Sequence, residues 1–283
     1  MKNLALVLWT IVSLNISSGT IADDHSKPMT KAAAVLDQTI ADGRLNFAVA
    51  AVGNAGGQTW SYAAGYQDAE KTNVASPDNI IQIASMTKLV TTIAALQLME
   101  QGKLNLDSPI SVYAPELNDL QLLKGFEADE TPIFEKAKRA PTARELMTHT
   151  AGYVYEIWNA NALKGVQLGV TPSLLGEGNY LEAPLAFQPG TAWEYGINTD
   201  WLGVLVERLS GQRLAHYFDD NIFTPLSMTD TFYELPADKL DRSVTMMARA
   251  AEGLVELPGF QPMPRKKGSM PHYSGGGGLF STV

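Results

Sequence analysis

A long apolar stretch over residues 84–101 constrains the fold more than any other feature of this chain. Its apolar residues recur at helical spacing, cover more than one face of the predicted helix, and are followed by Gly102 as a stop signal. They are Met86, Leu89, Val90, Ile93, Ala94, Leu96 and Met99. A helix that is apolar over so much of its circumference is expected to be buried, so the chain should fold around it.

A serine and a lysine lie at the start of this helix, within Ser85-Met86-Thr87-Lys88. Residues three apart share a helical face, so the hydroxyl of Ser85 and the amine of Lys88 would be neighbours. The helix dipole and apolar surroundings both disfavour a charged amine here, and a neutral amine can accept a proton. A hydroxyl beside a base is the minimum that covalent acyl transfer requires. An N-cap role for Ser85 and a surface position for Lys88 explain the same residues without catalysis.

Tyr195 lies in a loop ahead of a second predicted helix, which is capped by Asn198 or Thr199 and stops at Gly211. A phenol beside a cationic lysine could act as a base toward the serine, although an aromatic residue in a loop usually packs against its neighbours. Four further aromatic residues could line a pocket or pack in the core: Trp158, Trp193, Tyr153 and Tyr155.

Metal and phosphate chemistry are disfavoured by the remaining residues. None of the four histidines is paired at the spacing of metal ligands, which argues against a zinc hydrolase. The sequence also has no Gly-x-Ser-x-Gly elbow and no Gly-rich phosphate-binding loop that ends in Lys-Ser or Lys-Thr.

The elements before and after the long helix predict an α+β arrangement. Two strand-like runs, residues 47–52 and 59–64, are joined by a Gly-containing turn and predict a hairpin that follows a helix over residues 30–42. Residues 142–145 show the capping-box pattern of a short helix. Residues 127–139 form a charged stretch that is expected to be exposed.

Charge and composition restrict the partners and the compartment. The 283 residues carry a net charge of −9 without basic blocks, which argues against nucleic-acid binding and polyanionic substrates. Residues 1–22 have the pattern of a signal peptide, because Lys2 precedes an apolar run too short to span a membrane. We therefore expect a periplasmic or secreted protein with no stable membrane insertion after signal removal. The absence of cysteine excludes disulfides and a cysteine nucleophile.

Several segments, taken in order, resemble the serine β-lactamase-related superfamily of class C β-lactamases, D-Ala-D-Ala carboxypeptidases and family VIII carboxylesterases. Residues 81–88 resemble the nucleophile segment of that superfamily, and residues 145–152 resemble its Leu-Leu-Thr-His-Thr-Ser-Gly segment. Residues 187–195 resemble the approach to its catalytic tyrosine. Residues 199–203 and 275–282 match further segments, so the resemblance spans about residues 30–283.

This resemblance implies that Ser85 is acylated and that Lys88 and Tyr195 together accept and return its proton. The backbone N–H of Ser85 would form half of an oxyanion hole. The implied fold is α+β of the β-lactamase/DD-peptidase type: an antiparallel sheet flanked by helices, a largely helical region, and C-terminal strands that are missing. No metal or organic cofactor is implied.

Two departures from the family pattern bear on the substrate and on the activity of this chain. Class C β-lactamases carry Tyr-x-Asn, whereas here Ile197 takes the third position and Asn198 follows it. An apolar residue at that position and the sequence Ser-Met-Thr-Lys are both frequent in family VIII esterases. The chain also ends at Val283, ahead of the third family motif and of the strand that would give the second oxyanion donor. We interpret it as C-terminally truncated, so this form should be nearly inactive.

The sequence therefore predicts four segments and one preferred activity. After the signal peptide (1–22), residues 23–102 start the α/β domain, 103–255 are mostly helical and hold the Tyr195 loop, and 256–283 begin the return to the α/β domain. The preferred function is a serine carboxylesterase that acts on short-chain esters through acyl-Ser85. A β-lactamase or D-Ala-D-Ala carboxypeptidase acting on a β-lactam or peptide, and a non-catalytic penicillin-binding-like module, are the alternatives. The predicted substrate-binding residues are Asn198, Trp158 and Tyr153.

Overall fold

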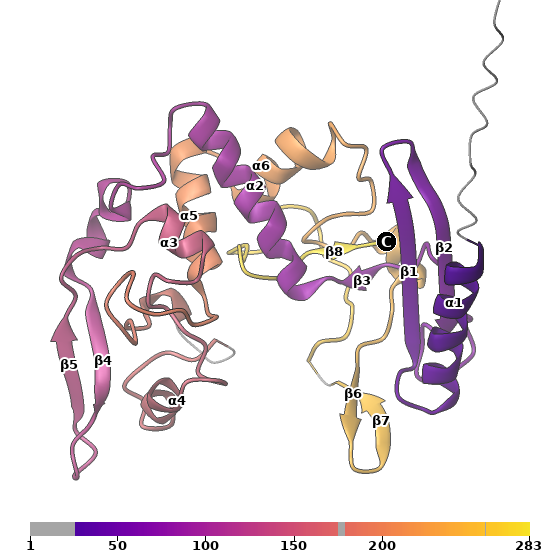
Figure 1. Ribbon diagram of the computed structural model, residues 1–283, viewed down its shortest axis with the longest axis horizontal. Coiled ribbons are helices and arrows are strands. Elements are labelled where there is room, and N and C mark those ends of the chain that lie inside the picture. Colours follow the sequence, from indigo (N-terminus) through magenta and orange to yellow (C-terminus); the bar gives the residue numbers. More distant parts are fainter. Residues whose placement is uncertain (1–25, 175–178, 258) are drawn as a thin grey trace, which may run out of the picture.

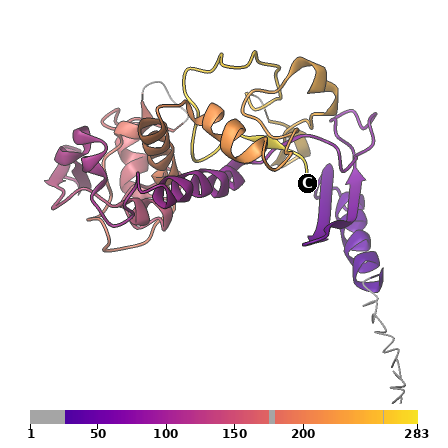
Figure 2. The same ribbon diagram turned by 90° about the horizontal axis from the view of Figure 1, so that it is seen from above.

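The computed structural model describes residues 26–174, 179–257 and 259–283. The first elements form a separate layer at one end of the molecule (Figures 1 and 2). There the helix α1 (Ser26–Ala41) packs against the antiparallel hairpin of β1 (Phe47–Asn54) and β2 (Gly57–Gly65). The helix and the hairpin that the sequence predicts are therefore confirmed.

The predicted long helix consists of two parts. A single 3-10 turn, η1 (Ala84–Met86), leads directly into α2 (Thr87–Glu100). The short strand β3 (Ile81–Gln82) enters this turn and pairs antiparallel with β8 (Phe280–Ser281). The last described strand of the chain therefore lies beside the start of α2, as Figure 1 shows.

The other end of the molecule is built mainly from the segment that follows α2 (Figure 1). Its elements are η2 (Ile110–Val112), η3 (Pro115–Asp119), β4 (Gln121–Phe126), β5 (Pro132–Lys136), α3 (Ala143–Met147), α4 (Ala160–Gln167) and η4 (Tyr180–Glu182). The side chain of Thr142 accepts from the N–H of Glu145, and the carboxylate of Glu145 accepts from the N–H of Thr142, which confirms the capping box.

Strand β5 lies within the charged stretch for which the sequence indicated exposure alone. Its side chains are almost all exposed, so its sequence lacks the alternation of apolar and polar residues that marks a half-buried strand. It pairs with β4 in a second hairpin. The prediction of a mostly helical region over residues 103–255 thus missed this hairpin, and it also missed a third one, β6 (Met247–Ala250) with β7 (Gly253–Glu256).

Helix α5 (Asn198–Ser210) packs against α2 and forms the main core with it. The N-cap of α5 is Ile197, so the predicted capping by the side chain of Asn198 or Thr199 is wrong. Three elements follow α5 in the chain: α6 (Leu214–Phe218), the π-helix η5 (Asp219–Phe223) and the 3-10 helix η6 (Ala237–Arg242).

The prediction that this apolar helix is buried also needs correction. Its buried face consists of Thr87, Val90, Thr91, Ala94, Ala95 and Leu98. On another face, Met86 of the preceding turn and Leu89 and Ile93 of α2 are 60%, 67% and 38% exposed. Within the described ranges, α2 therefore has one packed face and one open apolar face.

The predicted signal peptide, residues 1–22, lies outside the described residues, and export stays a prediction. Among the helices that the structure describes, none has the length and apolar character needed to cross a membrane.

Candidate active site

Ser85 lies where the chain turns from a strand into a helix. It occupies the middle of η1, and it is exposed. The preceding residue, Ala84, has a φ of +44°, in the left-handed region that residues with a side chain seldom adopt. Two backbone hydrogen bonds hold this turn, from the N–H of Ile83 to the carbonyl of Leu279 at 2.9 Å and from the N–H of Met86 to the carbonyl of Ile83 at 3.0 Å. The strained turn leaves the serine accessible to a substrate.

The amine of Lys88 contacts three oxygen atoms. Its Nζ donates to the Oγ of Ser85 at 3.2 Å, to the hydroxyl of Tyr155 at 3.3 Å and to the carbonyl of Gly276 at 2.7 Å. An ammonium has three protons, so each oxygen receives one when Lys88 is charged. A carbonyl oxygen only accepts, whereas the two hydroxyls can also donate. A neutral Lys88 in this position would therefore receive a proton from the hydroxyl of Ser85 or of Tyr155.

Aromatic rings enclose the same amine. Nζ of Lys88 lies 4.7 Å from the centroid of the Tyr195 ring and 5.6 Å from that of the Tyr155 ring. Both contacts are of the cation–π type, which favours the charged amine. The indole of Trp158 lies 5.7 Å and 5.6 Å from the Tyr155 and Tyr195 rings, and it is 62% exposed. The structure thus brings Ser85, Lys88, Tyr195 and Trp158 together.

Tyr155 is the residue of this cluster that sequence analysis placed only among possible pocket or core aromatics. Burial raises the pKa of its hydroxyl, and the negative charge of Asp200 raises it further. Tyr155 is therefore a neutral phenol at neutral pH, able to accept from Lys88 and to donate its own proton. Its position three residues after Gly152, at the end of the segment that resembles a family motif, was the available signal.

His149 supports the ring of Tyr195 from another side, with the two ring centroids 4.5 Å apart. Burial lowers the pKa of His149 to about 4, and the charge of Lys88 acts in the same direction. The imidazole is therefore neutral at neutral pH. Its Nδ1 lies 3.4 Å from the backbone nitrogen of Gly196 and 3.0 Å from the Nδ2 of Asn198. Both of these groups are donors, so this network assigns the proton of the imidazole to Nε2.

The glycine segment 275–278 reaches the site because it lies directly on α5. A Cβ on Gly275 would overlap the carbonyl oxygen of Thr199, and a Cβ on Gly276 would overlap the carboxylate of Asp200. The carbonyl of Gly275 accepts from the hydroxyl of Thr91 in α2 at 2.7 Å. This close approach fixes the carbonyl of Gly276 toward Lys88.

Two of the predicted substrate-binding residues do not face a substrate. Asn198 and Tyr153 are fully buried, with exposed fractions of 0%. The Nδ2 of Asn198 donates to the backbone carbonyl of Tyr153 at 3.0 Å, besides facing His149. The prediction that these two side chains contact substrate is therefore corrected: they join α5 to the loop that carries Tyr155. Contact of Trp158 with substrate stays a prediction.

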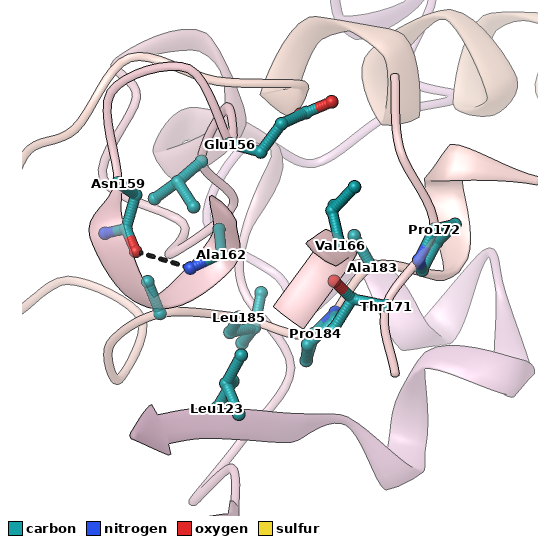
Figure 3. A pocket seen from close by; sticks show the side chains of 12 residues that line it. Leu123, Glu156, Asn159, Ala162, Val166, Thr171, Pro172, Ala183, Pro184 and Leu185 are labelled. Atoms are coloured by element: carbon teal, nitrogen blue, oxygen red, sulfur yellow. Dashed lines mark hydrogen bonds between the residues drawn. The ribbon is translucent and has the colours of Figure 1, made fainter. Parts of the chain in front are cut away.

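A cavity lies beside this loop but does not include the reacting groups. Val154 and Glu156, the sequence neighbours of Tyr155, line it together with Leu123 of β4 and Ala162 of α4 (Figure 3). Its volume is about 30 Å³, which is room for about two water molecules. Neither Ser85 nor Lys88 lines this cavity, so the reacting groups lie outside it.

The family follows from comparison with known sequences. The sequence profile of the Beta-lactamase family matches residues 32–283. The chain belongs to the Beta-lactamase family. Its α+β fold, with helices and small antiparallel sheets, agrees with that of solved members of this group. A variant of simvastatin synthase from Aspergillus terreus superposes with a TM-score of 0.78 at 28% identity, over 94% of this chain and 65% of that chain.

Two curated relatives carry names that state an activity. The acyltransferase calJ of Penicillium decumbens is 34% identical over 81% of this chain and 56% of its own length. A lovastatin esterase of Penicillium rubens is 40% identical over 58% of this chain and 42% of its own length. This chain therefore spans about half the length of these relatives.

Proposed function

We propose that this Beta-lactamase family protein is a serine carboxylesterase that hydrolyses short-chain esters through an acyl intermediate on Ser85. The hydrogen bond between the Nζ of Lys88 and the Oγ of Ser85, at 3.2 Å, carries the proposal. It joins a nucleophile to a base that can take its proton. The names of the similar esterase and acyltransferase support the proposal, because both activities move an acyl group.

The acylation step uses the groups around Lys88 as follows. The Oγ of Ser85 attacks the ester carbonyl carbon while its proton passes to the neutral amine of Lys88. The resulting oxyanion would accept from the N–H of Ser85, since the first N–H groups of a helix have no partner within the helix. The C–O bond then breaks, and the leaving alkoxide takes the proton from Lys88. The rings of Tyr155 and Tyr195 favour the transient ammonium.

Deacylation repeats the same proton transfers with water as the nucleophile. Water attacks the acyl carbonyl and gives a proton to Lys88, and the Oγ of Ser85 takes that proton back as the carboxylic acid leaves. Tyr155 remains a phenol throughout, because burial raises its pKa, and it orients the amine through its hydroxyl.

An ester is preferred over a β-lactam because of the residues next to the nucleophile. Met86, directly after Ser85, and Leu89, directly after Lys88, are exposed and apolar, and the indole of Trp158 lies nearby. These surfaces suit an apolar acyl or alcohol group. Ile197, where class C β-lactamases would carry an amide, is 2% exposed and offers no hydrogen bond to a β-lactam side chain.

A second candidate is transfer of the acyl group to an alcohol in place of water. The acyltransferase name of the relative calJ favours it, and the acyl-Ser85 intermediate would be the same. The two candidates are separated by adding an alcohol to the ester reaction and measuring the new ester against the free acid. New ester in excess of free acid would favour the acyltransferase.

Labelling by a fluorophosphonate probe tests the shared first step on the chain as it stands. We expect covalent labelling at Ser85, none in Ser85→Ala, and at least ~100-fold slower labelling in Lys88→Met. The control is Lys103→Met, which removes an exposed lysine just beyond the end of α2 and should label at the original rate. Equal labelling of the original chain and Ser85→Ala would overturn the proposal.

Substrate assays then distinguish the remaining functions. Turnover of p-nitrophenyl butyrate that depends on Ser85 supports the esterase. Turnover of nitrocefin at a comparable rate would favour a β-lactamase. A folded protein that is not labelled at Ser85 would be a non-catalytic module.

A further inference from the structure

Asp200 is a buried carboxylate in the first turn of α5, with an exposed fraction of 1%. Among the described residues it makes no ion pair with a lysine, arginine or histidine at direct contact distance. Burial of a carboxylate is costly unless hydrogen bonds replace its hydration. The partners of Asp200 therefore indicate why a charge is retained in this position.

Three donors converge on one oxygen of this carboxylate. The Oδ1 of Asp200 accepts from the hydroxyl of Tyr180 at 2.9 Å, from the hydroxyl of Ser274 at 2.5 Å and from the N–H of Gly276 at 3.1 Å. Of these donors, Gly276 belongs to the glycine segment, and Ser274 directly precedes that segment. The carboxylate thus holds in place the segment whose Gly276 carbonyl accepts a hydrogen bond from Lys88.

Gly276 contacts Asp200 and Lys88 through its two backbone groups. Its N–H donates to Asp200, and its carbonyl accepts from the Nζ of Lys88 at 2.7 Å. A Cβ on Gly276 would overlap the carboxylate of Asp200, so the two groups are in close contact. The backbone of Gly276 alone therefore connects the carboxylate of Asp200 to the amine of Lys88 through hydrogen bonds. We propose that Asp200 is a positioning residue for Lys88, which holds the acceptor carbonyl of Gly276 in place and favours the ammonium formed when the serine proton is transferred.

The groups in direct contact with the amine of Lys88 are uncharged. The groups that face the amine are the hydroxyls of Ser85 and Tyr155, the ring of Tyr195 and the carbonyl of Gly276. His149, behind Tyr195, is neutral above about pH 4. The negative charge of Asp200 also reaches Tyr155, whose pKa it raises. Glu156 also raises the pKa of Tyr155, as the smallest of the causes, whereas Asp200 is the buried carboxylate that Gly276 connects to Lys88.

The substitution Asp200→Asn separates charge from shape. The amide keeps an oxygen that can accept from Gly276 but loses the negative charge. Without that charge, the ammonium that forms on Lys88 during proton transfer is stabilised less. We therefore expect the acid limb of the phosphonylation rate of Ser85 to move to lower pH by about 1 unit. The control Ser274→Ala removes one donor to Asp200 and keeps the charge, so the midpoint of its acid limb should stay in place.

This inference rests on the proposed function, and the two fail in different ways. If the original chain is not labelled at Ser85, the proposed function fails. If the original chain is labelled and Asp200→Asn has the same acid midpoint, only the role of Asp200 is overturned. Circular dichroism checks folding, and Asp200→Ser, which keeps a hydroxyl as acceptor, is the second variant. Loss of folding in both variants would also overturn the proposal, because Asp200 would then determine stability and not the state of Lys88.

Discussion

The hydroxyl of Tyr155 lies 3.3 Å from the amine of Lys88, whereas Tyr195 meets the same amine with the face of its ring. Removal of each hydroxyl should therefore have a different effect. We expect Tyr155→Phe to slow the labelling of Ser85 by ~10- to 100-fold, because Lys88 loses one of its three acceptors. Tyr195→Phe keeps the ring and should slow labelling less.

The relative size of these two effects on labelling indicates which groups carry the proton of Ser85. A loss in Tyr195→Phe as large as that in Lys88→Met would mean that the hydroxyl of Tyr195 takes part in proton transfer, as the sequence resemblance implies. Tyr195→Leu also removes the ring and with it the cation–π contact, so it should slow the labelling of Ser85 by about tenfold.

The glycine segment offers a matched pair of substitutions. Gly276→Ala would place a Cβ onto the carboxylate of Asp200 and displace the carbonyl that binds Lys88. We expect it to lower the free energy of unfolding by about 1–3 kcal/mol and to abolish most labelling of Ser85. At Gly277 the nearest atoms to an added Cβ are 4.0 Å away, so Gly277→Ala should change the free energy of unfolding little. Equal effects of the two substitutions on urea unfolding and labelling would contradict this account.

The left-handed backbone at Ala84 predicts that a glycine at this position would stabilise the folded protein. Removing the Cβ relieves a steric cost of about 1–2 kcal/mol, while the added freedom of the unfolded chain takes back about 0.5–1 kcal/mol. Ala84→Gly should therefore raise the free energy of unfolding by about 0.5–1 kcal/mol. Ala34→Gly, in the exposed interior of α1, should lower it by about 1 kcal/mol. Urea titration measures both changes, and the same sign for the two would refute the assignment of strain.

His149 makes the stability of the protein depend on pH. The pKa of His149 is about 4 in the folded protein, below the ordinary histidine value of 6.5 that applies to the unfolded chain. The unfolded chain therefore binds the proton more readily. The contribution of His149 is therefore complete above pH 6.5 and is lost as the pH falls toward 4. Partial exposure of the ring reduces the effect to about 2 kcal/mol.

The variant His149→Asn isolates this contribution. Asparagine tolerates the positive φ of +57° at this position better than other residues. Urea titrations at several pH values should show a smaller loss of stability on acidification in the variant than in the original chain. An unchanged slope would show that His149 does not titrate as proposed.

The sequence predicted those elements whose signals are local. The hairpin of β1 and β2 and the capping box at Thr142 each depend on residues close together in the chain, and both are confirmed. The juxtaposition of Ser85 and Lys88 is also local, because helical spacing produces it. Strand β5 was missed because it is exposed on nearly all sides and carries no periodic signal.

The rest of the site depends on contacts between distant residues. Tyr155 and Gly276 reach Lys88 from 67 and 188 positions further along the chain, and no spacing rule connects them. The burial of Asn198 and Tyr153 was missed for the same reason, because it results from the packing of α5 against the loop after α3. Residue type suggested polar and aromatic contacts with substrate, whereas tertiary packing turned both side chains inward.

The exposed indole of Trp158 also contributes an optical signal from the edge of the site. It touches the rings of both tyrosines around Lys88, so we expect it to lie beside an acyl group on Ser85. The emission of an indole changes when water around it is replaced by an apolar group. The arrival and departure of the acyl group could therefore be followed in real time, with unlabelled esters and without a chromogenic leaving group.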